Sequence, residues 1–162
     1  MSESPLRLRR ATTTDLAAAN RVIEAAVMSW DLPERVKRLS LPSYRYHAHD
    51  LEHLDLLVAD EPSVGIVGVA AWEPADPKDT PKGSRALLLH GLYVAPDRHR
   101  RGIGSRLLKA AEAIARDRGY DGVLVKAQPS AEDFFVSQGL ERLAVLDAAR
   151  DYPHRFWKRL RD

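Results

Sequence analysis

A short loop rich in arginine and glycine is the part of the sequence best suited to hold an anion. It follows a long apolar run, precedes a segment of helical periodicity, and consists of Arg100, Arg101, Gly102, Ile103, Gly104 and Ser105. Glycines permit a left-handed backbone, so main-chain N–H groups can converge on one anion, and a helix start adds roughly +0.5 elementary charge. Arginines at its edge, Arg98 included, could add bidentate contacts. We expect a pyrophosphate site, although a plain turn with solvated arginines fits the loop taken alone equally well.

Two blocks of the sequence together resemble the GNAT (GCN5-related) N-acetyltransferase superfamily. The first, Leu92–Leu108, contains a strand that ends in Val-Ala-Pro and is followed by Arg-Arg-Gly-Ile-Gly. The second, Gln128–Leu140, is similar to the family segment Asn-x-x-Ala-x-x-Phe-Tyr-x-x-x-Gly-Phe. The resemblance is closest from about Ile66 to Leu143. It implies one α/β (α+β) domain over residues 1–162, with a mixed sheet of about seven strands flanked by about four helices.

The resemblance also implies acetyl-coenzyme A as co-substrate and assigns its contacts. Main-chain groups of Leu92, Tyr93 and Val94 would pair with the amides of the pantetheine arm. The pyrophosphate would be held by His99, Arg100, Arg101, Gly102, Ile103, Gly104 and Ser105. Gln128 stands where relatives often have an asparagine that contacts the thiol-end arm.

Two positions depart from the family pattern. His99 stands where glutamine or arginine is usual, which changes the side-chain contribution to pyrophosphate binding. Phe135 stands where many relatives have the tyrosine that protonates the departing thiolate, and phenylalanine has no proton to give. Another group or water would have to supply that proton, or the thiolate would leave unassisted.

His90 is the residue that we expect to act as the general base. In an extended strand it shares a face with Leu88, Leu92 and Val94. An amine must be neutral to attack a thioester, so a base that works near neutral pH is useful. The position is similar to that of a strand histidine in the arylalkylamine N-acetyltransferases. The alternative is a histidine that only packs beside the strand and hydrogen-bonds to the backbone.

The expected activity is direct acetyl transfer from acetyl-coenzyme A to a primary amine of a small molecule or peptide. The chain has no cysteine, which removes the commonest covalent route. A regulatory domain that binds acetyl-coenzyme A without transferring the acetyl group is the main alternative. A nucleic-acid-binding module built on the arginines is less favoured, because no aromatic residue is interleaved with them.

Four aromatic residues are candidates for the acceptor side of the site: Trp30, Tyr44, Tyr46 and Tyr152. In this superfamily the segment that contains the first three usually lines the acceptor side, which implies an apolar or aromatic acceptor. Core packing fits these residues at least as well, and a β-turn fits Tyr152 with Pro153 and His154.

A histidine-rich stretch offers a competing site. His49 and His53 have the i, i+4 spacing of a zinc-binding pair, and Asp50 and Glu52 could add oxygen ligands. The stretch lacks the glutamate of the His-Glu-x-x-His motif, so we expect a solvated helix or a wall of the acceptor site, and no metal.

Length, charge and composition limit the remaining classes of function. With 162 residues the chain has the length of one domain, and 25 Lys+Arg against 23 Asp+Glu leave a net charge of +2. Neither nucleic acid nor a membrane is indicated, and anion binding has to be local. The lack of cysteine also excludes disulfides and cysteine-based metal sites. The N-terminus has no apolar leader run, so we expect a cytoplasmic protein; a homodimer is possible, as is common in relatives.

Hydrophobic periodicity predicts the elements that carry these residues. The expected strands are Leu6–Arg9, Leu54–Ala59, Ile66–Trp72, Arg85–Val94, Val123–Val125, Leu143–Leu146 and Arg155–Trp157. The expected helices are Leu16–Ser29, one that starts near Pro33 and is interrupted by Pro42, one from Gly104 to Gly119, and Ala131–Gln138. The segment Pro74–Gly83 is predicted to be a loop.

Overall fold

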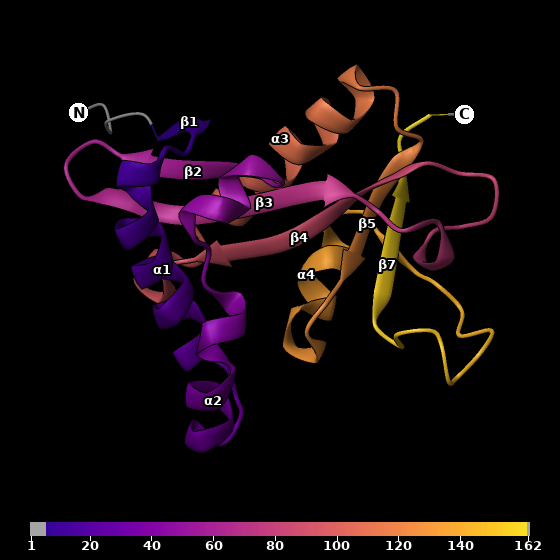
Figure 1. Ribbon diagram of the computed structural model, residues 1–162, viewed down its shortest axis with the longest axis horizontal. Coiled ribbons are helices and arrows are strands. Elements are labelled where there is room, and N and C mark those ends of the chain that lie inside the picture. The colour runs from indigo at the N-terminus through magenta and orange to yellow at the C-terminus, as the bar shows by residue number, and fades with distance from the viewer. Residues whose placement is uncertain (1–5, 162) are drawn as a thin grey trace. The chain divides into compact units, whose positions relative to one another are not determined.

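Seven strands form one mixed sheet in the described part of the chain, residues 6–161 of a computed structural model (Figure 1). The strands are β1 (Arg7–Arg10), β2 (Asp55–Glu61), β3 (Gly65–Pro74), β4 (Ala86–Val94), β5 (Gly122–Lys126), β6 (Glu141–Arg142) and β7 (Arg155–Arg159). Their order is β1-β2-β3-β4-β5-β7-β6. The β4–β5 pair is parallel, whereas β1–β2, β5–β7 and β6–β7 are antiparallel.

The described part of the chain also contains four α-helices: α1 (Leu16–Met28), α2 (Glu34–Tyr44), α3 (Ile103–Asp117) and α4 (Glu132–Ser137). Short 3-10 helices are η1 (Thr13–Asp15), η2 (Ala48–Glu52), η3 (Pro77–Asp79), η4 (Pro96–Arg98) and η5 (Pro129–Ala131). The expected fold class, a mixed sheet of about seven strands with about four helices, is confirmed. No described helix has both the length and the apolar composition needed to cross a membrane.

The chain divides into two compact units, each of which contains part of β3 and part of β4. The first contains the residues up to Ala71 together with Gly91–Leu108. The second contains Trp72–His90 and the residues from Lys109 onward.

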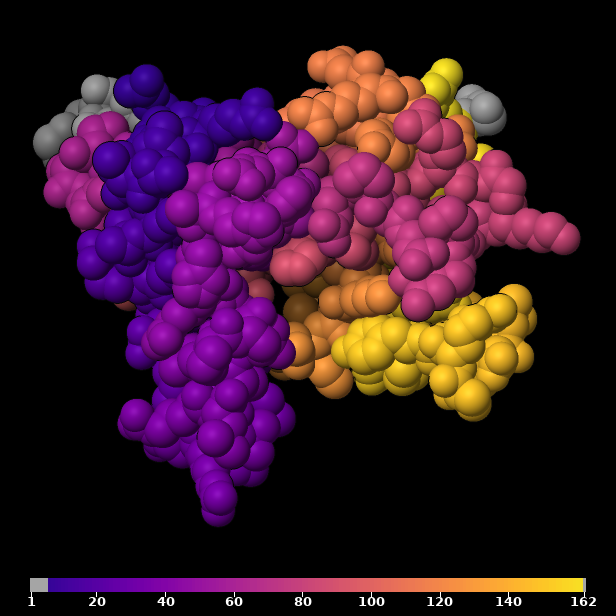
Figure 2. Space-filling model, viewed as in Figure 1, coloured from indigo at the N-terminus to yellow at the C-terminus, as the bar shows by residue number. Residues whose placement is uncertain are grey.

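The core of the first unit forms because α1 buries one helical stripe: Ala19, Val22, Ile23, Ala26 and Val27. The stripe packs with buried residues of β2 and β3, and α2 lies beside α1 (Figure 1). Asn20 fixes the chain after α2, because its amide donates to the Tyr46 carbonyl at 2.8 Å and accepts from the Tyr46 N–H at 2.9 Å. In Figure 2, α2 forms part of the outer surface of this unit.

Two of the charged residues buried in the second unit are Arg155 and Glu112. The Arg155 guanidinium donates to the carbonyls of Asp79 at 2.9 Å and Ala144 at 3.1 Å. These buried N–H groups therefore have hydrogen-bond acceptors. Buried Glu112 on α3 pairs with Lys158 on β7 at 2.8 Å. Both charges connect segments that are distant in sequence.

Two elements differ from the expectation. The predicted strand Leu143–Leu146 is wrong, because β6 comes earlier and consists of Glu141–Arg142. After the Leu143 N–H bonds to the Arg155 carbonyl, the N–H groups of Leu146 and Asp147 turn to the carboxylate of Asp151. The interruption expected at Pro42 is also wrong, since α2 continues to Tyr44. Pro42 lies in the last turn, where its missing N–H removes a single intrahelical bond.

We predict that Asp15→Asn lowers the free energy of unfolding by about 1–2 kcal/mol at pH 7, because Arg9 donates two 2.9 Å hydrogen bonds to this carboxylate. Arg9 holds the pKa of Asp15 well below its usual range, so the folded-state pKa lies below the unfolded one. The stabilisation is therefore complete at neutral pH and is lost as the pH falls below about 4.

Urea unfolding at pH 7 and pH 3 tests this prediction, with the exposed Asp31→Asn as the control. A difference between Asp15→Asn and wild type that is equally large at both pH values would contradict it.

Candidate functional site

The loop between β4 and α3 has the backbone shape of an anion cradle. Arg100 has φ 66° and Gly102 has φ 76°, and among the described residues Arg100 is the one non-glycine residue with positive φ. Left-handed residues beside right-handed ones turn successive N–H groups to one side of the chain. A left-handed arginine is costly, so the surrounding structure has to hold the loop in this shape.

The first turn of α3 adds more main-chain donors. Its first α-type bond runs from the Arg106 N–H to the Gly102 carbonyl at 3.0 Å. The N–H groups of Ile103 and Gly104 therefore have no acceptor within the helix, and the helix dipole makes this end positive. The side chain of Ile103 is buried, which anchors the turn to the first unit.

Two basic side chains of the loop are used to fix it. Arg98 donates from Nε to Glu61 on β2 at 2.9 Å, its side chain is 17% exposed, and Glu61 raises its pKa. Arg98 thus differs from the expectation of an arginine open to a ligand. The His99 Nε2 lies 3.2 Å from the Val94 carbonyl, so His99 ties the loop back to β4. Arg100 and Arg101 are exposed at its edge.

The two faces of β4 differ in burial from Leu87 to Val94. Leu87, Leu89, Gly91 and Tyr93 are buried, whereas Leu88, Leu92 and Val94 are half-buried and His90 is exposed. This alternation agrees with the shared face that the sequence predicts for His90. The β4–β5 register ends at the pair Leu89–Val125, so His90 is the first β4 residue past it.

The candidate acceptor residues of the first unit form an aromatic cluster with Tyr93. The rings of Trp30 and Tyr44 meet edge to face at 5.4 Å, and those of Tyr44 and Tyr93 at 6.5 Å. Burial raises the pKa of Tyr93, so its hydroxyl stays protonated. Tyr46 is only 3% exposed and belongs to the core, the alternative considered for it from the sequence. Trp30 and Tyr44 are half-buried.

The second unit contains the remaining candidates. Gln128 follows β5 at the start of η5, and the Tyr152 hydroxyl donates to the Ala127 carbonyl at 2.8 Å. Phe135 is buried against the ring of Phe156. The His154 Nδ1 forms a close contact with the Glu132 carboxylate.

The sequence did not predict the contact between Glu132 and His154. The two residues are 22 positions apart, and each lies in a short segment without a charge pattern that links them.

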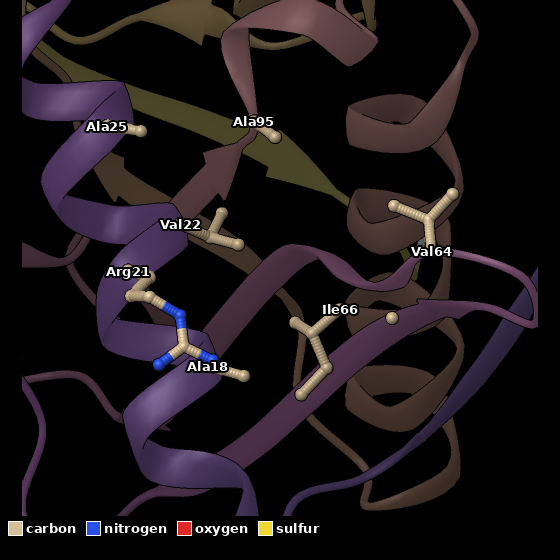
Figure 3. Close-up of a pocket in the computed structure, with 8 residues that line it drawn as sticks. Ala18, Arg21, Val22, Ala25, Val64, Ile66 and Ala95 are labelled. Carbon is tan, nitrogen blue, oxygen red and sulfur yellow. The ribbon is translucent and has the colours of Figure 1, made fainter.

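A shallow pocket of about 290 Å³ lies in the first unit (Figure 3). The pocket is lined by residues of α1, the β2–β3 turn, the start of β3 and the residue after β4: Ala18, Arg21, Val22, Ala25, Val64, Gly65, Ile66 and Ala95. None of the residues singled out from the sequence lines it. Apolar side chains and one guanidinium form its wall.

We predict that Gly91→Ala destabilises the protein, because a Cβ at this position would lie 2.6 Å from the Tyr46 hydroxyl and 2.7 Å from the Tyr93 ring. Both aromatic residues are buried, so relief of the clash has to move core side chains, at a cost of about 1–3 kcal/mol. Thermal unfolding of Gly91→Ala and of Gly91→Ala/Tyr46→Phe measures the effect. Partial recovery in the double variant is expected, and a wild-type melting temperature in the single variant would refute the prediction.

The chain was compared with protein families and with known proteins. The model of the family described as acetyltransferase (GNAT) matches residues 24–140. No curated protein matches the chain.

Solved structures share the fold over nearly the whole chain. A GNAT acetyltransferase from Brucella melitensis in complex with acetyl-CoA is 19% identical, with a TM-score of 0.66 over 98% of this chain and 90% of its own. The PaiA N-acetyltransferase from Thermoplasma acidophilum, in complex with coenzyme A, is 16% identical, with a TM-score of 0.72 over 96% and 99%. A GCN5-related N-acetyltransferase from Rhodopseudomonas palustris is 23% identical, with a TM-score of 0.70 over 99% of each chain.

Proposed function

Because the chain belongs to the acetyltransferase (GNAT) family, we propose that it transfers an acetyl group from acetyl-coenzyme A to a primary amine of a small molecule or peptide. The observation that carries the proposal is the loop with left-handed Arg100 and Gly102 at the start of α3. A pyrophosphate needs several convergent donors and a positive field, and a loop of this backbone shape at a helix start would supply both. The solved complexes with acetyl-CoA and coenzyme A support the same cofactor here.

The proposal assigns coenzyme A contacts to three groups of residues. Main-chain groups of Arg101 to Ser105 would hold the pyrophosphate, with Arg100 and Arg101 adding charge from the exposed edge. The later part of β4, at Leu92 and Val94, would offer strand-like pairing to the two pantetheine amides. The side-chain amide of Gln128 would meet the thiol-end arm.

In the proposed reaction the amine attacks the thioester carbonyl directly. His90 takes the amine proton, directly or through one water, as the new C–N bond forms; the C–S bond then breaks and coenzyme A leaves as its thiolate. A main-chain N–H near Val94 would stabilise the negative charge on the carbonyl oxygen. Direct attack suits a chain without cysteine. The aromatic pair Trp30 and Tyr44 would favour an acceptor with an apolar or aromatic portion.

A domain that binds acetyl-coenzyme A without catalysis is the second candidate. The observation that favours it is the burial of Phe135 against Phe156, which leaves the usual tyrosine position of α4 without a proton donor. The cytoplasmic location and the homodimer stay predictions.

We predict that Gly102→Ala weakens coenzyme A binding about tenfold, because a Cβ disfavours φ 76° and the loop would relax away from the cradle shape. A Cβ at Gly102 meets no atom within 4 Å, so the effect is one of backbone conformation alone. Isothermal titration calorimetry with coenzyme A measures it. Gly83→Ala is the matched control, since Gly83 has φ 82° and equally open surroundings. Equal affinities of the two variants would refute the pyrophosphate assignment.

We predict that His90→Gln lowers kcat/KM for the best amine by about 10²-fold or more while leaving the Kd for coenzyme A unchanged. Thiol release across an amine panel between pH 6 and pH 9 measures the first quantity, and calorimetry measures the second. The exposed His47→Gln serves as the control. Full activity of His90→Gln across this range would exclude His90 as the base. Binding of acetyl-coenzyme A without thiol release for any amine would instead favour the non-catalytic domain.

A further inference from the structure

Two histidines and a glutamate form an exposed cluster on the segment between α2 and β2. His49 and Glu52 lie on η2, and His53 is the next residue. One ligand atom of each lies within 4.8 Å of the other two. The segment reaches the surface on the face shown in Figure 2 and belongs wholly to the first unit. None of the three is needed for the core, since all are exposed.

The two imidazole rings have the geometry of a pair of metal ligands. Their Nε2 atoms are 3.2 Å apart, and the rings meet edge to face with centroids at 4.6 Å. Two nitrogens bound to a tetrahedral zinc ion at roughly 2.0–2.1 Å stand about 3.3 Å apart. Without a metal, the contact needs one ring to donate and the other to accept, in competition with water, and such an exposed hydrogen bond stabilises little.

The carboxylate of Glu52 completes the cluster. Its Oε2 lies 3.4 Å from the Nδ1 of His49, so it favours the tautomer that carries its proton on Nδ1 and leaves the Nε2 lone pair for a metal. The side chain is 71% exposed and can also turn to the metal itself. The other carboxylate of the segment, Asp50, accepts from the His47 N–H at 2.7 Å and is used to cap η2.

From this geometry we propose that His49, His53 and Glu52 form a surface site for one divalent transition-metal ion. The chemical class is zinc or its borderline neighbours nickel, cobalt and copper, because imidazole nitrogens suit these ions, whereas magnesium and calcium prefer all-oxygen sites. The site takes no part in the acetyl transfer proposed above, which needs no metal. It adds a metal-dependent clamp to the segment that follows Tyr46.

A bound ion would join both ends of one helical turn. The ligands His49 and His53 bracket η2, whose own bonds include those from the His53 and Leu54 N–H groups to the Asp50 carbonyl at 3.1 and 2.7 Å. Opening of this turn would then require release of a ligand, since the ion binds the closed turn and not the open one. Amide exchange in this turn should therefore slow when metal is added.

Calorimetric titration of the full chain, free of any affinity tag, with zinc chloride tests the site. Wild type should bind one ion. His49→Gln and His53→Gln should each weaken the affinity more than tenfold, and Glu52→Gln should weaken it about tenfold, as loss of an orienting carboxylate does. His47→Gln is the matched control, because His47 is an exposed histidine of the same segment outside the cluster and should leave the affinity unchanged.

Hydrogen exchange gives a second, local readout. Zinc should slow exchange of the His53 and Leu54 amides in wild type and in His47→Gln, and should have no such effect in His53→Gln. Either of two results would overturn the proposal: no zinc binding by wild type, or binding that survives both His49→Gln and His53→Gln. Circular dichroism of each variant confirms that a lost site is not a lost fold.

Discussion

The alternation of side chains along β4 is the constraint on which the rest of the structure depends. One face of the strand packs Leu87, Leu89, Gly91 and Tyr93 into the interior, and the other leaves His90, Leu92 and Val94 open to different degrees. A one-residue slip would exchange the two faces, so His90 would be buried and Tyr93 exposed. Gly91 shows how tightly the register is fixed, because the Tyr46 hydroxyl and the Tyr93 ring occupy the place of its missing side chain.

The backbone of the loop after β4 is held in place by two of the loop's own side chains. Four consecutive basic residues, 98–101, look alike in the sequence, but the structure divides them into two pairs. Arg98 and His99 turn inward to Glu61 and to the Val94 carbonyl, and they hold the backbone in place. Arg100 and Arg101 stay at the exposed edge. For the pyrophosphate site proposed above, this means that the main-chain N–H groups would already be oriented before the anion binds, which is the advantage of a preorganised site.

Hydrophobic periodicity predicted helices and strands correctly wherever the element has one clearly apolar face. The boundaries of α1, β4 and α3 agree with the periodicity to within one or two residues, and Gly119 and Gly139 have the positive φ expected of helix ends. The hydrophobic pattern predicted a strand at residues 143–146, which is wrong. This apolar run leaves the sheet, and the N–H groups at its end donate to the carboxylate of Asp151. A carboxylate that caps two N–H groups leaves no trace in a hydrophobic pattern.

The sequence by itself determined the class of fold, the position of the glycine- and arginine-rich loop and the family, because these depend on spacings of a few residues along one strand, one loop and one helix. Only the tertiary structure decided which side chains remain available. It assigned Arg98 to Glu61, placed Tyr46 in the core, joined His154 to Glu132 and brought His49 and His53 within 3.2 Å. These pairings depend on where the backbone places two side chains in space and on which of them it buries, and the identity of a residue alone does not specify either.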